Sequence, residues 1–179
     1  MRLAQKPANG PFQVVLIDRY NYHQFQPLFH QVATSGLAPS AIAFPVRKAF
    51  HKTPNFHFRM AEVEQILPEK NVIETSIGEI AYEHLVLATG ADTNYFGNKS
   101  IATHAYPMKS VQEALLLRNH ILQCMETALN ETDSAKRAAL MNIVIVGGGP
   151  TGTEVACALA EMKRYVLPKD YPELDFGQM

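Results

Sequence analysis

The chain has 179 residues, of which 47% are hydrophobic and 18% are charged, so it can bury a core and is not globally disordered. Its net charge of −1 gives no basic excess of the kind that indicates a nucleic-acid partner. The two cysteines form no CxxC pair and exclude a disulfide framework, and no apolar run approaches the roughly 20 residues of a membrane helix.

The first third of the chain predicts one strand and then an irregular segment. Leu3–Lys6 is typical of the tail of a helix. Val14–Ile17 is a continuous β-branched run, which indicates a strand buried on both faces of a parallel sheet. This strand ends in Asp18. Residues 19–55 are irregular and aromatic-rich, with a short helix expected within residues 39–50.

The next segment alternates polar and apolar residues as a β-meander does. Its expected strands cover residues 56–59, 62–67, 71–75 and 79–82. Residues 83–90 then predict a buried strand that ends in small residues, and residues 91–109 are polar and loop-like. Ser110 and Glu113 form a capping-box pattern, which predicts a helix that ends near Asn130. The apolar positions of that helix share one stripe: Ala114, Leu115, Leu117, Ile121, Leu122 and Met125.

The sharpest motif lies at residues 143–152. Ile143–Val146 predicts a buried strand, and Gly147, Gly149 and Gly152 then satisfy G-x-G-x-x-G before a predicted helix. In a dinucleotide-binding loop the first glycine permits the tight turn. The second lets the backbone approach a pyrophosphate, and the third lets helix and strand pack closely. The alternative is an ordinary glycine-rich turn.

The ribose-binding acid of this unit is not evident. It is expected about 20 residues after the glycines, where Glu173 and Asp175 lie in a proline-containing loop. By contrast, Val14–Asp18 resembles the second strand of another dinucleotide-binding unit, with Asp18 as its ribose-binding acid. The alternative is that Asp18 is an ordinary solvated acid after a strand. These patterns predict that the sequence begins within one nucleotide-binding unit and ends within another.

Together these segments resemble the type II NADH dehydrogenases, single-subunit NADH:quinone oxidoreductases among the flavoproteins with two dinucleotide-binding domains. The resemblance covers nearly the whole chain. The segments that carry it are Val15–His23, Phe25–Leu37, Leu85–Ala91, Asn94–Gly97, Val146–Gly152 with Glu154, and Leu167–Pro172. The Phe25–Leu37 segment is much more specific than the glycine motif.

The resemblance implies a partial α/β Rossmann-like FAD/NAD(P)-binding fold with a parallel sheet and a small antiparallel meander. It implies an FAD-binding domain over residues 1–105, without its first strand and glycine loop. A connecting helix over 106–140 and the start of an NADH-binding domain over 141–179 would follow.

The resemblance also implies site residues. Asp18 would hold the FAD ribose with Arg19 nearby, the Val63 backbone would border the adenine, and Gln31 to Thr34 would run beside the flavin ring. The turn Ala88, Thr89 and Gly90 would close over the FAD. The NADH pyrophosphate would be cradled by Gly147, Gly149, Pro150, Thr151 and Gly152, and the proposed catalytic residue, Glu154, would lie towards the nicotinamide–flavin contact. A first-turn acid favoured by the helix dipole is the alternative for Glu154.

The implied activity is transfer of electrons from NADH through FAD to a quinone, with no proton pumping. The enzyme would be peripheral to the membrane and would reach its surface through parts absent from this sequence. Whether it forms a homodimer is left open by the resemblance. Cys124 and Cys157 are expected to be packing residues. His30 stands where the family often has tyrosine, and a packing role is favoured for it. The histidine spacing does not favour a zinc site.

Two alternatives stay open. One is a truncated polypeptide that binds little and is catalytically inactive, because the first glycine loop and the NADH ribose acid are not found. The other is a related flavoprotein such as a sulfide:quinone reductase, against which the lack of cysteines near residues 27–34 counts.

Overall fold

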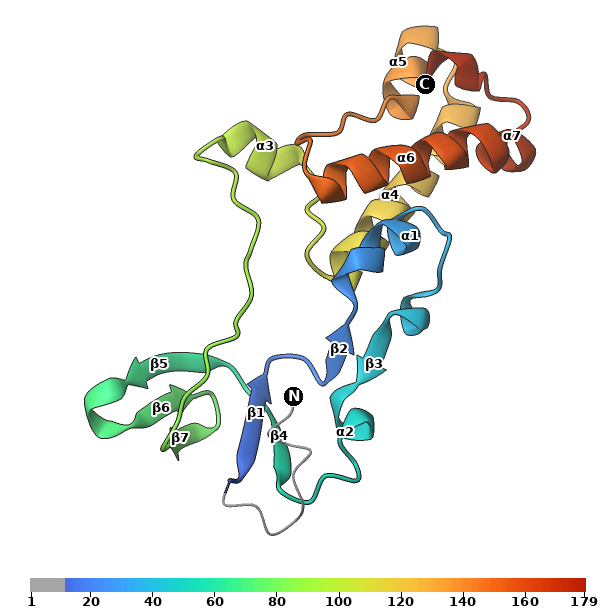
Figure 1. Ribbon diagram of the computed structural model, residues 1–179. Helices are drawn as coiled ribbons and strands as arrows, with labels where there is room; N and C mark the ends of the chain where they lie inside the picture. The colour runs from blue at the N-terminus through green and yellow to red at the C-terminus, as the bar shows by residue number, and fades with distance from the viewer. Residues whose placement is uncertain (1–11) are drawn as a thin grey trace. The chain divides into compact units, whose positions relative to one another are not determined.

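The structure is a computed structural model that describes residues 12–179 (Figure 1). The helix tail predicted at Leu3–Lys6 therefore lies outside the described residues. The chain divides into two compact units. Unit 1 holds the described residues up to His23 together with Ala43–Ala91, and unit 2 holds Gln24–Ile42 and Asp92–Met179.

A parallel strand pair begins unit 1. Strand β1 (Val14–Asp18) pairs with β4 (Phe56–Met60), so that Asp18 lies opposite Met60 at the carboxyl ends of both strands. The predicted strand ending in Asp18 is thus confirmed. Its predicted burial on both faces is wrong, because β4 is its one partner among the described residues and Val15 and Leu16 stay exposed.

Asn55 stabilises the start of the β1–β4 pair through its side chain and its backbone. The buried Asn55 amide donates to the Phe12 carbonyl at 2.9 Å, and the Val14 N–H donates to the Asn55 carbonyl at 2.9 Å. The prediction that residues 56–59 belong to the meander is wrong, because these residues pair with β1 instead. An aromatic-rich strand pattern predicts a strand but does not specify its partner.

Three further strands of unit 1 form the predicted antiparallel meander, in the order β5–β6–β7 (Figure 1). The turns are made by residues in the left-handed region, Asn71 at φ 51° and Gly78 at φ 108°, where these residue types are tolerated best. The bounds are β5 Val63–Leu67, η3 Pro68–Lys70, β6 Val72–Thr75 and β7 Gly78–Ala81.

Several short elements lie between β1 and β4. Strands β2 and β3 pair with each other, and helix α2 confirms the short helix expected within residues 39–50. The bounds are β2 Tyr22–Gln24, η1 Gln26–Leu28, α1 Phe29–Ala33, η2 Pro39–Ala41, β3 Ala43–Pro45 and α2 Val46–Ala49.

Unit 2 is built on helix α4 (Val111–Asn130), whose predicted capping box is present. The Glu113 N–H donates to Ser110 Oγ at 3.2 Å, and the Ser110 N–H donates to the Glu113 carboxylate at 3.0 Å. Two free N–H groups at the helix start are thereby satisfied. The other helices of unit 2 are α3 Lys99–His104, α5 Ser134–Met141, α6 Pro150–Tyr165, α7 Leu167–Asp170 and η4 Phe176–Gln178.

The core of unit 2 lies between α4, α5, α6 and the segment after α6 (Figure 1). Met125 and Leu167 are both 0% exposed within it. The face of α6 that enters the core repeats at helical spacing, and its members are Val155, Ala158, Leu159 and Met162. Helix α1 contacts both α4 and α6, which places the predicted flavin-side segment against the helix after the glycine loop.

Three local predictions are wrong. Residues 83–90 and 143–146 form no strands, and Val86 and Val144 are 79% and 75% exposed. A strand needs a neighbouring backbone to bond with, and no strand among residues 12–179 pairs with either segment. The loop predicted over 91–109 contains α3, which is capped by Asn98 through a bond from the Ile101 N–H.

A buried tyrosine ties the segment after α7 to α4. The Tyr171 hydroxyl donates to Glu126 Oε1 at 3.0 Å. Burial, followed by this hydrogen bond and the negative charge of Glu126, raises the pKa of Tyr171 above its usual value of about 10. The neutral phenol is therefore favoured in the folded chain.

Replacing Tyr171 with phenylalanine should lower the free energy of unfolding by about 1–3 kcal/mol, because a hydrogen bond to a charged group is lost. Because folding raises this pKa, the phenol's contribution is complete below about pH 10 and is lost as pH rises through the folded-state value. Urea unfolding at pH 8 and above pH 10 measures both effects. The matched control is the exposed Tyr165→Phe, and equal effects of the two substitutions would contradict this account.

Candidate nucleotide-binding site

The glycine loop of unit 2 has the geometry that a phosphate-binding turn needs. Gly147 has φ 109°, a conformation open to glycine. A Cβ atom at Gly152 would lie 2.1 Å from the Gly147 carbonyl oxygen, so the helix and the loop can pack this closely only without a side chain. A Cβ at Gly148 or Gly149 would meet nothing within 4 Å, so the loop has open space beside it.

Helix α6 starts directly after this loop. Gly149 is its N-cap and offers no side-chain acceptor, and Pro150 occupies the first turn. The N-terminus of a 16-residue helix carries partial positive charge and N–H groups without intrahelical partners. No acidic residue lies in the first turn, so Glu154 is not the first-turn acid that the sequence left as an alternative.

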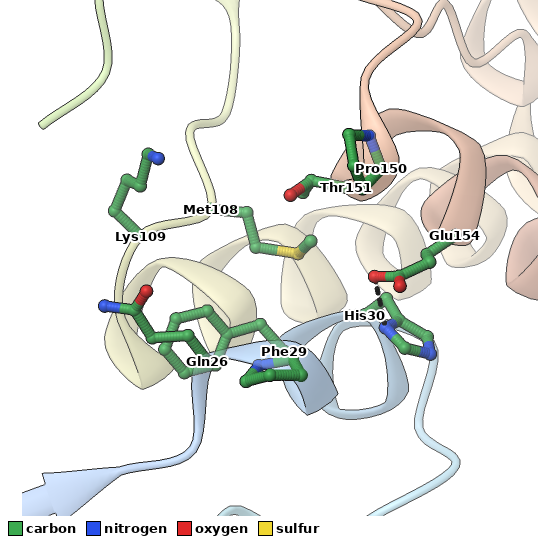
Figure 2. Close-up of a pocket in the computed structure, with 9 residues that line it drawn as sticks. Gln26, Phe29, His30, Met108, Lys109, Pro150, Thr151 and Glu154 are labelled. Carbon is green, nitrogen blue, oxygen red and sulfur yellow. Dashed lines mark ion pairs between the residues drawn. The ribbon is translucent and has the colours of Figure 1, made fainter. Parts of the chain in front are cut away.

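A cavity of about 280 Å³ lies beside the start of α6 (Figure 2). Its walls come from η1, α1, the segment before α4, and the first turns of α6. The lining residues are Gln26, Pro27, Phe29, His30, Met108, Lys109, Pro150, Thr151 and Glu154. The cavity thus combines an apolar wall with a cation, an imidazole and a carboxylate.

An ion-pair contact crosses this cavity between α1 and α6. Nδ1 of His30 lies 3.4 Å from Oε2 of Glu154, with the side chains 15% and 48% exposed. His30 was expected to be a packing residue. Its burial agrees with packing, but its ring also faces the carboxylate that was predicted to be catalytic.

A second cavity, of about 210 Å³, lies farther along α6. Gln31 and Thr34 line it together with Ala158, Glu161 and Met162 of α6. The Thr34 hydroxyl donates to the His30 carbonyl at 2.9 Å, which orients that side chain. Gln31 and Thr34 therefore share a surface with α6, and their predicted place beside a flavin stays a prediction.

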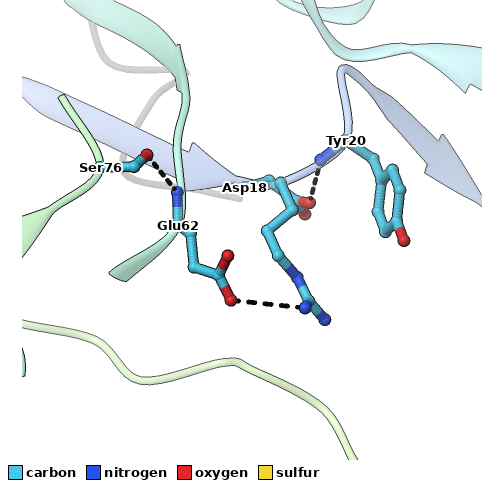
Figure 3. A network of polar contacts seen from close by, with 5 residues as sticks. Asp18, Tyr20, Glu62 and Ser76 are labelled. Carbon is cyan, nitrogen blue, oxygen red and sulfur yellow. Dashed lines mark hydrogen bonds and ion pairs between the residues drawn. The ribbon is translucent and has the colours of Figure 1, made fainter. Parts of the chain in front are cut away.

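In unit 1, Asp18 lies at the carboxyl end of β1, opposite Met60 of β4, and Glu62 lies close to it (Figure 3). Asp18 Oδ1 accepts the Tyr20 N–H at 2.8 Å, and Arg19 Nη1 lies 3.5 Å from Glu62 Oε1. The exposed Val63 follows Glu62, which makes two hydrogen bonds with Ser76.

Those bonds fix the approach to β5. The Glu62 N–H donates to Ser76 Oγ at 3.0 Å, and the Ser76 N–H donates to the Glu62 carbonyl at 2.9 Å. A strand-end carboxylate therefore lies near an arginine and an exposed backbone edge. The carboxyl ends of parallel strands are where open α/β sheets bind ligands.

The predicted turn at Ala88, Thr89 and Gly90 is exposed, and Gly90 has φ 73°. The hydrogen bond of Asp18 and the ion pair of Arg19 go instead to Tyr20 and Glu62. Their predicted closure over a cofactor stays a prediction.

The two cysteines differ in environment. Cys124 packs beside the core, its Sγ lies 3.6 Å from His120 Nε2, and burial raises the pKa of its thiol. Cys157 is exposed, so the prediction that it packs the helix is wrong, because it lies off the Val155–Met162 face of α6. Within residues 12–179 the structure contains no cluster of three residues that could hold a metal ion.

Comparison with known proteins gives the family. The profile described as "Pyridine nucleotide-disulphide oxidoreductase" matches residues 1–168. The chain belongs to the pyridine nucleotide-disulphide oxidoreductase family. Within it, the chain is a homologue of the type II NADH:quinone oxidoreductases.

The individual relatives agree. A type II NADH:quinone oxidoreductase of Mycobacterium tuberculosis is 35% identical over 98% of this chain and 39% of its own length. An external alternative NADH-ubiquinone oxidoreductase of Yarrowia lipolytica is 29% identical over 91% of this chain and 30% of its own. This chain therefore spans between a quarter and two fifths of these relatives.

Solved structures confirm the Rossmann-like fold predicted from the sequence. The structure of NDH2 from Plasmodium falciparum in complex with NADH superposes with a TM-score of 0.86 at 24% identity. It covers 93% of this chain and 35% of that one. The sulfide:quinone oxidoreductase of Aquifex aeolicus is less similar, with a TM-score of 0.58 over 64% of this chain. Among the described residues no helix is long and apolar enough to cross a membrane.

The structure adds Glu62, Lys109 and the His30 side chain to the predicted site residues. No motif spacing links His30 to Glu154, which are 124 positions apart in the sequence, or Lys109 to Thr151. For Glu62 a signal was available, since it lies at the start of a predicted strand next to Val63.

Proposed function

We propose that this chain forms the cofactor-contacting part of an FAD-dependent enzyme that transfers electrons from NADH to a quinone. The observation that carries the proposal is the packing, within unit 2, of the flavin-side helix α1 against α6, the helix after the glycine loop. The two family segments thus share a cavity that contains Glu154.

The glycine loop fits the pyrophosphate of NADH. We assign this binding to Gly147, Gly149, Pro150, Thr151 and Gly152. The open space beside the loop lets the backbone approach phosphate oxygens, and the uncapped start of α6 offers N–H donors and partial positive charge. The negative charge of Glu154, within the same cavity, would orient the nicotinamide end of the ligand.

The adenosine part of FAD would bind at the carboxyl ends of β1 and β4 in unit 1. Asp18 would accept hydrogen bonds from the ribose hydroxyls, with Arg19 nearby and the Val63 backbone bordering the adenine. Gln31 and Thr34 would line the flavin ring, and Ala88, Thr89 and Gly90 would close over the cofactor. FAD, when bound, supplies the hydride acceptor and the route for two electrons to the quinone.

The domain division belongs to the same proposal: an FAD-binding region over 1–105, a connecting helix over 106–140 and an NADH-binding region from 141. The partners would be a quinone and a membrane surface. A homodimer belongs to the same proposal.

Anaerobic reduction tests the proposed reaction. The full chain is loaded with FAD, separated from free cofactor and mixed with NADH. Loss of the visible flavin absorption, with recovery on adding a quinone, is the expected result. A protein that holds FAD but is reduced by dithionite and not by NADH would contradict the proposal.

Substituting Asp18 with asparagine should weaken FAD binding by about 10- to 100-fold, because charge-assisted bonds to the ribose contribute about 1.5–3 kcal/mol. Asparagine keeps the oxygen that accepts the Tyr20 N–H, so the strand end is retained. Fluorescence titration of FAD measures the change. The control is Asp92→Asn, because Asp92 Oδ1 also caps a local N–H, from Thr93 at 2.7 Å. Equal losses in both variants would argue against the ribose contact.

The second candidate is a catalytically inactive polypeptide of the same family. The exposed apolar segments around Val86 and Val144 favour it, because exposed apolar runs without strand partners promote association between chains. This candidate predicts no FAD retention after gel filtration, and the reduction experiment separates the two.

A further inference from the structure

We propose that His30 is a positioning residue that holds the Glu154 carboxylate against the wall of the 280 Å³ cavity. This inference rests on the proposed function for the identity of the ligand. It starts from the 3.4 Å approach of His30 Nδ1 to Glu154 Oε2 and from the place of both side chains in the cavity wall (Figure 2).

The two partners are anchored unequally. The His30 side chain is only 15% exposed, and the His30 backbone carbonyl accepts from both the N–H and the hydroxyl of Thr34, at 3.1 and 2.9 Å. Glu154 is about half exposed on α6 and has three rotatable side-chain bonds. The histidine is therefore the fixed element, and the glutamate is the group whose direction it sets.

The other charged group lining this cavity is Lys109, and the remaining wall includes Phe29, Met108 and Pro27. Without the His30 ring, the Glu154 carboxylate can turn into water, because moving a charged group from water into a protein interior costs free energy. Held by the ring, it stays among the residues that would face the nicotinamide end of NADH.

The geometry makes the role of His30 specific to one ring nitrogen. Nδ1 is two bonds from Cβ, as is the side-chain nitrogen of asparagine, whereas the nitrogen of glutamine lies one bond farther out. Asparagine at position 30 can therefore donate to Glu154 from the Nδ1 position, while glutamine cannot do so without displacing its neighbours. Phenylalanine keeps the ring volume and removes the donor.

Coupling between the two residues is measured first on the full chain without cofactors. Urea unfolding of His30→Phe, Glu154→Ala and the double variant forms a double-mutant cycle. We expect a coupling of about threefold in the folding equilibrium constant, typical of an ion pair that is partly exposed. The cycle of His30→Phe with Glu161→Ala, another acid on α6, should be additive. Additivity in the Glu154 cycle would overturn the inference.

NADH binding then tests positioning by titration calorimetry. His30→Phe should weaken binding about fivefold, the equivalent of one modest hydrogen bond. His30→Asn should restore affinity to within about twofold of the unmodified chain, whereas His30→Gln should not. His30→Phe should have no effect when Glu154 is already alanine. An asparagine variant as weak as phenylalanine would overturn the inference.

The two experiments separate this inference from the proposed function. If the unmodified chain binds no NADH, the proposed function fails, and the coupling measured without NADH still decides whether His30 holds Glu154. If NADH binds but the coupling is absent, His30 is a packing residue and the proposed function is unaffected.

Discussion

Replacing Gly152 with alanine should reduce NADH affinity at least about 30-fold and lower the free energy of unfolding by about 2–4 kcal/mol. The added Cβ would lie 2.1 Å from the Gly147 carbonyl oxygen, a distance that backbone atoms do not tolerate. The loop must then move away from α6, and its N–H groups no longer converge on one anion. Alanine otherwise favours helices over glycine, so helix propensity opposes the predicted loss.

The neighbouring glycine provides the control. A Cβ at Gly148 meets nothing within 4 Å, so Gly148→Ala should leave the unfolding free energy within about 0.5 kcal/mol of the unmodified chain. Titration with NADH and urea unfolding give both quantities. Equal behaviour of the two alanine variants would show that the close approach of loop and helix does not matter.

Replacing Leu167 with alanine should lower the free energy of unfolding of unit 2 by about 2–5 kcal/mol. The Leu167 side chain is 0% exposed and packs in the core with Met125, Leu159 and Met162. Truncation removes buried methyl groups and leaves a cavity among side chains held by three separate helices. Few neighbours can move to fill it.

The matched variant is Leu116→Ala, because Leu116 is 59% exposed on α4. It should cost less than about 0.5 kcal/mol. Hydrogen exchange of the α4 and α6 amides, together with urea unfolding, measures the difference. Similar losses in the two variants would contradict the placement of Leu167 in the core.

Local patterns in the sequence predicted much of the fold. Ser110 and Glu113 specify a helix start through bonds within four residues, and the structure has both bonds. Asn71 and Gly78 mark meander turns because they tolerate positive φ. The strand ending in Asp18 follows from its β-branched run.

Long-range pairing was not predictable in this way. The apolar runs at residues 85–87 and 143–146 have strand composition, yet no backbone among the described residues pairs with them. Leu167 and Tyr171 lie in a proline-containing segment with no helical repeat of apolar residues, but they enter the core because α4 and α6 leave an apolar face there. The His30–Glu154 contact depends on how α1 packs on α6, which neither segment encodes alone.

Hydrogen–deuterium exchange of the full chain with and without NADH tests the central claim most directly. If the glycine loop binds the pyrophosphate, NADH should slow exchange at the amides of Gly148, Gly149, Thr151 and Gly152, and the Gly152→Ala variant should lose this protection. Unchanged exchange across the loop at saturating NADH, or protection confined to other segments, would contradict the account.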